Sequence, residues 1–455
     1  MKESLGPSPF TSIELAERAL HRRAVEAVIW GMPALNYNLM YQEMVRNTQG
    51  GFNQVLYWSR LLDWKNQTLT PNPDVIYLMP FINTKDIGPV VLEIPPADDG
   101  VFNGSIMNYW QAAIEDVGPG GVDKGKGGKY LILPPSYDKA KVPDGYIAMP
   151  SDTYQGYALL RSVLKSGSDA DVAKAVTYSK RIKLYPLSQA ANPPETKFVD
   201  ASEAVFDSTI QYDVRFFELL NQMVQAEPWL ERDKAMIDPL KTIGIERGKP
   251  FKPDAKTKQI LSDAIQEAKA WFDARYDTLP PYYDGERWFF PITEEMHQNI
   301  MSFFQTPDSY PIDARGTAYT LAFFSAKHIG EAQYYLLTGS DKDGKPLDGK
   351  SSYRLNVPAN APVTQYWSMT VYNRDTHAFI RNAARVGRSS QSPGLQKNAD
   401  GSADIFFGSK APSGQESNWV PTDVNGRFEV LSRFYGPKKP LFDKTWKLPD
   451  IEKTP

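Results

Sequence analysis

The sequence predicts a multi-domain chain of α and β structure: an N-terminal α+β module, a mostly helical middle region and a C-terminal antiparallel β-sandwich. Three observations carry this prediction. The 455 residues exceed what one hydrophobic core usually organises. The spacing of apolar residues changes from helical to strand-like near residue 74, and it changes twice more further along the chain. We therefore place the modules at residues 12–200, 201–330 and 331–455.

A helix is expected to begin near residue 12, because Thr11 and Glu14 have the spacing of a capping box. Apolar residues recur at helical spacing as far as Val28. The segment Gly31-Met32-Pro33 is expected to interrupt the helix, so that a second one runs from Pro33 to about Val45.

Short apolar or alternating runs follow, each bounded by turn-forming residues as strands are. They cover residues 75–79, 90–94, 105–109, 130–133 and 146–149. Their connections are too short for crossover helices, so antiparallel pairing is favoured.

The middle region returns to helical spacing. Ser151 is expected to cap a helix that carries Leu159 and Val163, and further helices are expected at 206–224, 257–276 and 315–329. Beyond residue 351, strand signals alternate with turn residues, which is typical of an antiparallel sandwich. They lie at 352–355, 365–372, 378–380, 404–407, 427–434 and 445–447.

Composition excludes several classes of function. The net charge of -3, from 51 basic and 54 acidic residues, gives no basic face for nucleic acid. No apolar run approaches the roughly 18 residues that a transmembrane helix needs. The chain has no cysteine, which removes disulfides, thiolate nucleophiles and iron–sulfur clusters.

No sequence motif for a cofactor or a metal is present, and we predict no cofactor. The four histidines show no helical metal spacing, although a site assembled from scattered histidines stays an alternative. The nucleophile elbow Gly-x-Ser-x-Gly and the dinucleotide motif Gly-x-Gly-x-x-Gly are both missing.

Polar residues beside aromatic ones at predicted strand ends are the candidate site. Asp74 and Tyr77 would place a carboxylate and a hydroxyl in a pocket at the end of a strand. Asn72 and Asp74 are also residue types that favour a turn. Glu115 and Asp116 could act as acid and base, or could simply face water.

Further candidates lie around these pairs. Asn108 and Trp110 precede the acidic pair, Asp152 and Arg161 follow the sheet, and an arginine suits a ligand carboxylate or phosphate.

Several segments together resemble proteins that pair two families, the domains of unknown function numbered 1254 (N-terminal) and 1214 (C-terminal). The segments are residues 71–77, 88–95, 366–372, 418–421 and 433–437. The resemblance covers roughly residues 12–450. Pro73 and Val75-Ile76 replace the middle of the family's usual Asn-Asp-Thr-Leu-Tyr, whereas Asp74 and Tyr77 match it.

The resemblance implies a jelly-roll form for the C-terminal sandwich and, because many relatives carry export signals, a periplasmic or secreted setting. The chain begins Met1-Lys2 without an apolar signal region. In the C-terminal motifs Trp367, Tyr372, Trp419 and Arg433 either pack between modules or line a cleft between sandwich and N-terminal sheet.

The preferred hypothesis is a hydrolase-like enzyme that acts on a small or oligomeric organic ligand in that inter-module cleft. Its proposed catalytic residues are Asp74, Tyr77, Glu115, Asp116 and Asp152, and its proposed binding residues are Asn72, Asn108, Trp110, Arg161, Trp367, Tyr372, Trp419 and Arg433. The alternatives are a non-catalytic ligand-binding or envelope assembly protein, and a metalloenzyme. Exposed sandwich edges favour a homo-oligomer.

Overall fold

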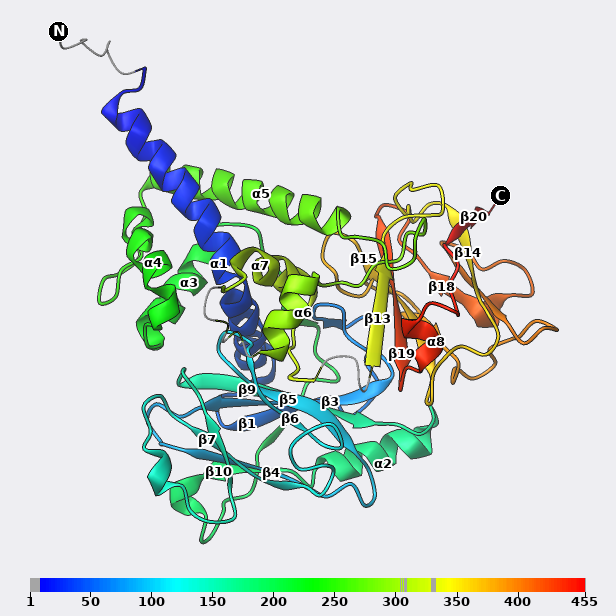
Figure 1. The fold of residues 1–455 in the computed structure, drawn as a ribbon, viewed down its shortest axis with the longest axis horizontal. Helices are drawn as coiled ribbons and strands as arrows, with labels where there is room; N and C mark the ends of the chain where they lie inside the picture. The colour runs from blue at the N-terminus through cyan, green and yellow to red at the C-terminus, as the bar shows by residue number, and fades with distance from the viewer. Residues whose placement is uncertain (1–8, 303, 305, 307–308, 329–332, 455) are drawn as a thin grey trace.

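The computed structural model describes residues 9–302, 304, 306, 309–328 and 333–454. A long N-terminal helix joins a β-rich module, a helical layer and a C-terminal β domain (Figure 1). The expected mixture of helices and several sheets, ending in a mainly antiparallel domain, is confirmed. Within the described residues, no helix combines the length and apolar character needed to cross a membrane.

The first helix, α1 (Ser12–Thr48), is continuous, so the predicted break at Gly31-Met32-Pro33 is wrong. Its predicted capping box is confirmed, since Thr11 and Glu14 each accept the other's backbone amide. Nearly all residues from 24 to 40 are buried, and helix α7 (Ile312–Leu321) packs across α1. Gly316 of α7 covers the Ile29 carbonyl, which Pro33 leaves without an amide donor. Tertiary packing therefore overrides the local signal.

The N-terminal module contains a six-stranded sheet of order β11-β1-β3-β9-β5-β6 and a four-stranded sheet of order β10-β4-β7-β8. Pairing is antiparallel as predicted, except for the parallel pairs β1–β11 and β7–β8 in these sheets. A short parallel ladder joins β2 to β12. The strands are β1 (Gln54–Tyr57), β2 (Asn66–Gln67), β3 (Val75–Asn83), β4 (Val90–Ile94), β5 (Phe102–Asn108), β6 (Ala113–Val117), β7 (Gly128–Leu133), β8 (Ile147–Pro150), β9 (Gln155–Val163), β10 (Lys183–Pro186), β11 (Phe198–Asp200) and β12 (Phe206–Asp207).

The helix predicted from Ser151 is wrong, because residues 155–163 form β9 in the middle of the large sheet. Both faces of β9 are covered, so its apolar residues run almost without alternation. A buried strand of this kind resembles a buried helix in its spacing. The correction places Arg161 on the sheet, opposite Tyr77 of β3.

The helices of the middle region cover one face of the large sheet (Figure 1). Two predicted helices are shorter than expected: the 206–224 helix begins at Arg215, after β12, and the 315–329 helix ends at Leu321. The remaining helices are α2 (Asp169–Ser179), α3 (Arg215–Ala226), α4 (Lys234–Ile237), α5 (Ala255–Asp277), α6 (Glu294–Met301) and α8 (Lys439–Phe442), with 3-10 turns η1 (Lys139–Lys141), η2 (Leu187–Gln189), η3 (Glu231–Asp233), η4 (Asp238–Ile243) and η5 (Glu416–Asn418).

The C-terminal domain contains two four-stranded sheets, of orders β13-β19-β15-β16 and β18-β17-β14-β20. All their pairs are antiparallel except β17–β18. The strands are β13 (Gln333–Thr338), β14 (Ser352–Val357), β15 (Trp367–Asn373), β16 (Gly387–Ser389), β17 (Ala403–Gly408), β18 (Trp419–Pro421), β19 (Phe428–Tyr435) and β20 (Glu452–Thr454). Residues 378–380 and 445–447 are not strands. The jelly-roll form and the exact module boundaries stay predictions.

A single apolar cluster joins the modules. It contains residues of α1, of the large sheet and of α5 and α7, and it extends to Leu337 of β13 and Leu431 of β19. The N-terminal sheet and the C-terminal domain are therefore held face to face through a shared core.

Gly104→Ala should destabilise the protein, because a Cβ at Gly104 of β5 would lie 2.0 Å from the backbone oxygen of Leu159 in β9. These two neighbouring strands would have to separate, at a cost of about 2 kcal/mol or more. The measurement is urea-induced unfolding followed by fluorescence.

The matched control is Gly167→Ala, since nothing lies within 4 Å of a Cβ there. We expect a change within about 0.5 kcal/mol for the control. Equal midpoints for both variants would contradict the close approach of β5 and β9.

Candidate functional site

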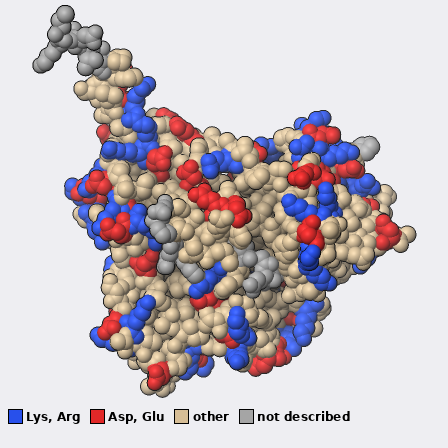
Figure 2. Space-filling model, viewed as in Figure 1, with Lys and Arg blue, Asp and Glu red and all other residues tan. Residues whose placement is uncertain are grey.

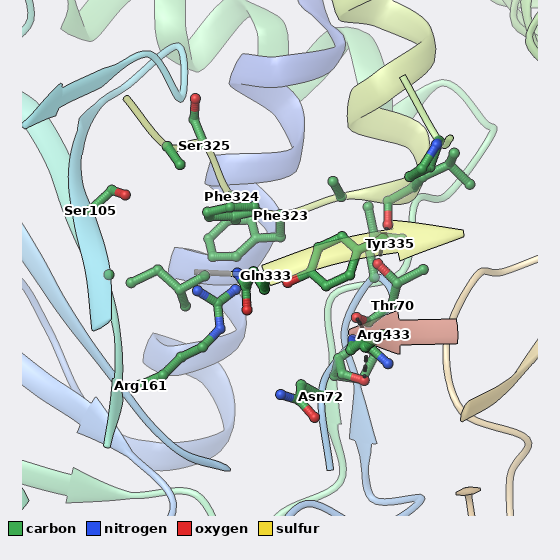
Figure 3. Close-up of a pocket in the computed structure, with 18 of the residues that line it drawn as sticks. Thr70, Asn72, Ser105, Arg161, Phe323, Phe324, Ser325, Gln333, Tyr335 and Arg433 are labelled. Carbon is green, nitrogen blue, oxygen red and sulfur yellow. Dashed lines mark hydrogen bonds between the residues drawn. The ribbon is translucent and has the colours of Figure 1, made fainter. Parts of the chain in front are cut away.

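A cavity of about 200 Å³ lies between the large N-terminal sheet and the first C-terminal sheet. Tyr77 and Arg161 lie in register on one wall, and Tyr335 and Arg433 lie on the other. Figure 3 shows Arg161, Tyr335 and Arg433 around this space. The chain that follows α7 closes a third side with Phe323, Phe324 and Ser325. The cavity is thus built by segments that are far apart in the sequence.

Strand alternation explains which side chains reach the cavity. On β9, Leu159 and Arg161 face it, whereas Leu160 packs into the core on the opposite face. Tyr77 and Asn103 lie beside Arg161 on the neighbouring strands in register. Polar and apolar groups therefore share one sheet face.

Arg161 is the least compensated charge in this cavity. Only 7% of the residue is exposed. Its Nε donates a long hydrogen bond of 3.4 Å to the Tyr77 hydroxyl, and its guanidinium lies 4.8 Å from the centre of the Phe324 ring. No described residue accepts a hydrogen bond from its two terminal nitrogens. In Figure 3 the guanidinium points into the cavity, toward Gln333.

Arg433 lines the same cavity, but both of its terminal nitrogens already have hydrogen-bond partners. It donates to the Thr370 hydroxyl at 2.9 Å, the Thr70 carbonyl at 2.8 Å and the Tyr372 hydroxyl at 2.6 Å. Figure 3 shows it beside Thr70 and Asn72. Its role is therefore to bind the loop ahead of β3 to the C-terminal sheet.

Asp74 lies close to Arg433 and is not part of the cavity wall. Burial raises the pKa of its carboxyl to about 6, and the Arg433 charge and the Ser368 hydroxyl offset this only in part. Its backbone amide donates to the Asn72 side chain at 3.0 Å, which is the turn that the sequence allowed.

Asp116 and His328 form an ordered pair at the cavity wall. One carboxylate oxygen of Asp116 lies 3.0 Å from Nδ1 of His328 and accepts the His328 amide at 2.8 Å. The other accepts the Ser105 hydroxyl at 2.7 Å and the Lys327 amide at 2.9 Å. The contact with Nδ1 fixes the imidazole and leaves Nε2 for another group.

The structure brings five of the predicted residues to the cavity and leaves the others elsewhere. Those in its wall are Asn72, Tyr77, Asp116, Arg161 and Arg433. Asp74 and Tyr372 lie near Arg433, outside the wall.

The remaining candidates are occupied by other contacts. Glu115 pairs with Lys327, and Asp152 accepts from Asn108 and Arg232. The three tryptophans are placed away from the wall: Trp110 contacts Trp30 in the core, Trp367 packs in the C-terminal core, and Trp419 donates to Gly408.

His328, Tyr335 and Phe324 were missed by the sequence reasoning. Tyr335 and Phe324 carry no motif, and only the fold brings them opposite Arg161. His328 did have a weak signal, since it is one of four histidines in 455 residues.

No group of three or more potential metal ligands occurs together within the described part of the chain. Each histidine has a different carboxylate neighbour: Glu267 for His21, Glu294 for His297, Asp116 for His328 and Glu429 for His377. The metalloenzyme alternative therefore finds no donor set in these residues.

Comparison with known families confirms the resemblance read from the sequence. Residues 52–186 match the family described as a protein of unknown function, DUF1254, and residues 332–439 match DUF1214, described in the same words. No curated protein matches the chain.

Two solved structures are similar to this chain. The VPA0106 protein of Vibrio parahaemolyticus is 18% identical with a TM-score of 0.58, over 96% of this chain and 100% of that one. An uncharacterized protein of Burkholderia cenocepacia is 11% identical with a TM-score of 0.40, over 96% and 94%. The similarity to the Vibrio protein concerns the fold alone.

Asp74→Asn should change how stability depends on pH. The pKa of Asp74 is raised from 3.8 to about 6 in the folded protein, so its contribution is fully present below pH 3.8 and is lost as pH rises through 6. Relative to the variant, the wild type should lose about 3 kcal/mol of unfolding free energy between these limits. Urea unfolding at a series of pH values measures this difference.

The same replacement at exposed Asp144 is the control, and it should leave the pH dependence of the wild type unchanged. An Asp74→Asn profile parallel to that of the wild type would show that this carboxyl is not held in a desolvated site.

Proposed function

We propose that this chain, a member of the proteins that pair DUF1254 with DUF1214, is an enzyme that acts on a small organic molecule in the inter-module cavity. The observation that carries the proposal is the Asp116–His328 pair in the cavity wall. A histidine oriented through Nδ1 by a carboxylate is a recurring arrangement for moving protons in enzymes. The proposal retains the inter-module cleft and Asp116 from the sequence-based hypothesis. It assigns proton transfer to His328 in place of a carboxylate.

The hydrogen bonds favour water over a serine as the group that His328 activates. Ser105 is the hydroxyl nearest to this pair, yet it donates to the Asp116 carboxylate at 2.7 Å. No described serine or threonine hydroxyl is hydrogen-bonded to the His328 ring. His328 would accept a proton from a water molecule as the water oxygen attacks the carbonyl carbon of an ester or amide. The bond from that carbon to the leaving group would then break, and the imidazolium would return the proton to the leaving group, so the reaction would be hydrolytic.

Access supports this role. Asp116 is almost completely buried, whereas 38% of the His328 side chain is exposed. The carboxylate is therefore protected while the imidazole stays within reach of a ligand. A buried carboxylate also stabilises the imidazolium that forms when His328 takes a proton.

A ligand-binding protein without catalysis is the second candidate, and one observation favours it. Asp116 accepts the backbone amides of Lys327 and His328, so it also fastens the segment that closes the cavity. In that alternative His328 is a structural contact, and saturable binding occurs without product.

A periplasmic or secreted setting and a homo-oligomer remain part of the proposal.

His328→Gln should abolish most turnover, because glutamine fills similar space but does not take up a proton. Wild-type protein incubated with a mixture of small esters and amides should form a product that mass spectrometry detects. We expect the rate to fall by about 10²- to 10⁴-fold in the variant.

His21→Gln is the matched control, since His21 lies on α1 and pairs with Glu267 outside the cavity. It should keep the wild-type rate. Full turnover in His328→Gln, or saturable binding by the wild type with no product, would overturn the enzymatic proposal.

A further inference from the structure

We infer that the ligand of this cavity is a monocarboxylate with a compact apolar body, and that its carboxylate binds Arg161. That the protein converts this ligand to a product rests on the proposed function. That the protein binds such a ligand follows from the charge, geometry and size of the cavity alone.

The charge of Arg161 is the first argument. A guanidinium stays protonated under all ordinary conditions, and burying it without an anion is costly. Among the described residues its neighbours are the Tyr77 hydroxyl, the rings of Tyr77 and Phe324, and the phenols of Tyr335 and Tyr435, and none of these is a carboxylate. Ring faces recover only part of the lost hydration. An anionic ligand group would supply the missing charge.

The geometry of Arg161 is the second argument. Its Nε is directed to Tyr77, which leaves the two terminal nitrogens pointing into the cavity. Two parallel N–H donors match the two oxygens of a carboxylate. The rings of Tyr77 and Phe324, at 5.4 and 4.8 Å from the guanidinium carbon, restrict its orientation before a ligand arrives.

The number of available charges favours a monoanion over a phosphate dianion. The described wall contains one other arginine, Arg433, and its donors already bind Thr370, Thr70 and Tyr372. Asp74 lies near Arg433 and supplies negative charge there. His328 is directed to Asp116. Among the described residues of the wall, Arg161 is left as the single unmatched positive charge.

The face of the molecule shown in Figure 2 does not provide a substitute for this charge. On this face, lysine and arginine are interspersed with aspartate and glutamate, so it carries no basic patch that would attract an anion.

The rest of the wall selects an apolar body. Leu159, Met79, Phe323, Leu337 and Leu431 all contribute to it. The volume of about 200 Å³ is somewhat above the ~150 Å³ of a cavity that accepts benzene. A ligand of about ten non-hydrogen atoms, the size of octanoate or phenylacetate, fits this space.

The test is isothermal titration calorimetry with octanoate and phenylacetate, and with octanol and methyl phenylacetate as uncharged counterparts. Wild-type protein should bind each acid at least about 10-fold more tightly than its uncharged counterpart. Arg161→Met, which replaces the charge with an apolar chain, should bind the acids about 100-fold more weakly, as loss of a buried charge contact does. It should bind octanol as tightly as the wild type or more tightly.

Arg161→Met also has a readout that needs no ligand. Replacing an unpaired buried charge by an apolar side chain is neutral or stabilising, so its melting temperature should equal or exceed that of the wild type. Arg354→Met, at an exposed arginine that pairs with Glu452, is the control and should keep wild-type affinity for octanoate.

Acetate and palmitate test the size of the cavity. Acetate should bind weakly because it leaves the cavity unfilled, and palmitate should bind weakly because it is too long for the cavity.

The outcomes separate this inference from the enzymatic proposal. Equal octanoate affinity in wild type and His328→Gln, together with no product from any ester or amide incubated with the wild type, would support the inference and contradict catalysis. Equal octanoate affinity in wild type and Arg161→Met, or no binding of either acid, would overturn the inference. So would turnover of a carboxylate-bearing ester at the same rate in wild type and Arg161→Met, although catalysis would then stand.

Discussion

The contact between Arg433 and the loop ahead of β3 is the interaction on which the rest of this site depends. Arg433 donates to the carbonyls of Thr70 and Pro71, more than 360 positions earlier in the chain. Tyr372 reinforces it by donating to Pro71 at 2.5 Å. Because these donors and acceptors are buried, separating the two modules would leave them unsatisfied. The contact therefore fixes the distance between the two cavity walls.

Other buried charges at the junction are satisfied in the same manner. Glu429 lies beneath the surface with His377 at 2.7 Å and Tyr276 of α5 at 2.9 Å. Arg374 reaches Asp277 at 2.8 Å, also on α5. These contacts bind the C-terminal sheet to the helical layer. Against this background Arg161 stands out, since every described hydrogen-bonding group near it is neutral.

An apolar cavity with one unmatched cation and one oriented imidazole combines two requirements of an enzyme site. The cation positions a ligand through a group that does not react, and the imidazole meets the ligand at another point of the wall. No described residue supplies a counterion to this cation, and a buried charge without one opposes folding. Residues retained at such a cost commonly serve function rather than folding.

Much of the architecture could be predicted from the sequence, because strands bounded by turn residues and a capped helix are local signals. The errors arose where tertiary contacts decide. Pro33 stays within α1 because α7 covers the affected carbonyl, and β9 was taken for a helix because both its faces are buried.

The same reason limits what could be predicted of the site. Asn72, Tyr77, Asp116 and Arg433 were selected as polar groups at strand ends and in family motifs. Arg161 was selected as an arginine suited to an anionic ligand, in a helix expected after the sheet, and the fold gathers all five at the cavity. His328 and Tyr335 approach only through long-range topology, which spacing in the sequence does not encode.

The most direct test of the central claim is a crystal structure of the protein grown with octanoate. We expect the octanoate carboxylate to lie within hydrogen-bonding distance of both terminal nitrogens of Arg161. The alkyl chain should lie along Leu159 and Leu431, and Arg433 should keep its hydrogen bond to Thr70. Octanoate bound elsewhere, or bound in the cavity with its carboxylate turned away from Arg161, would contradict it.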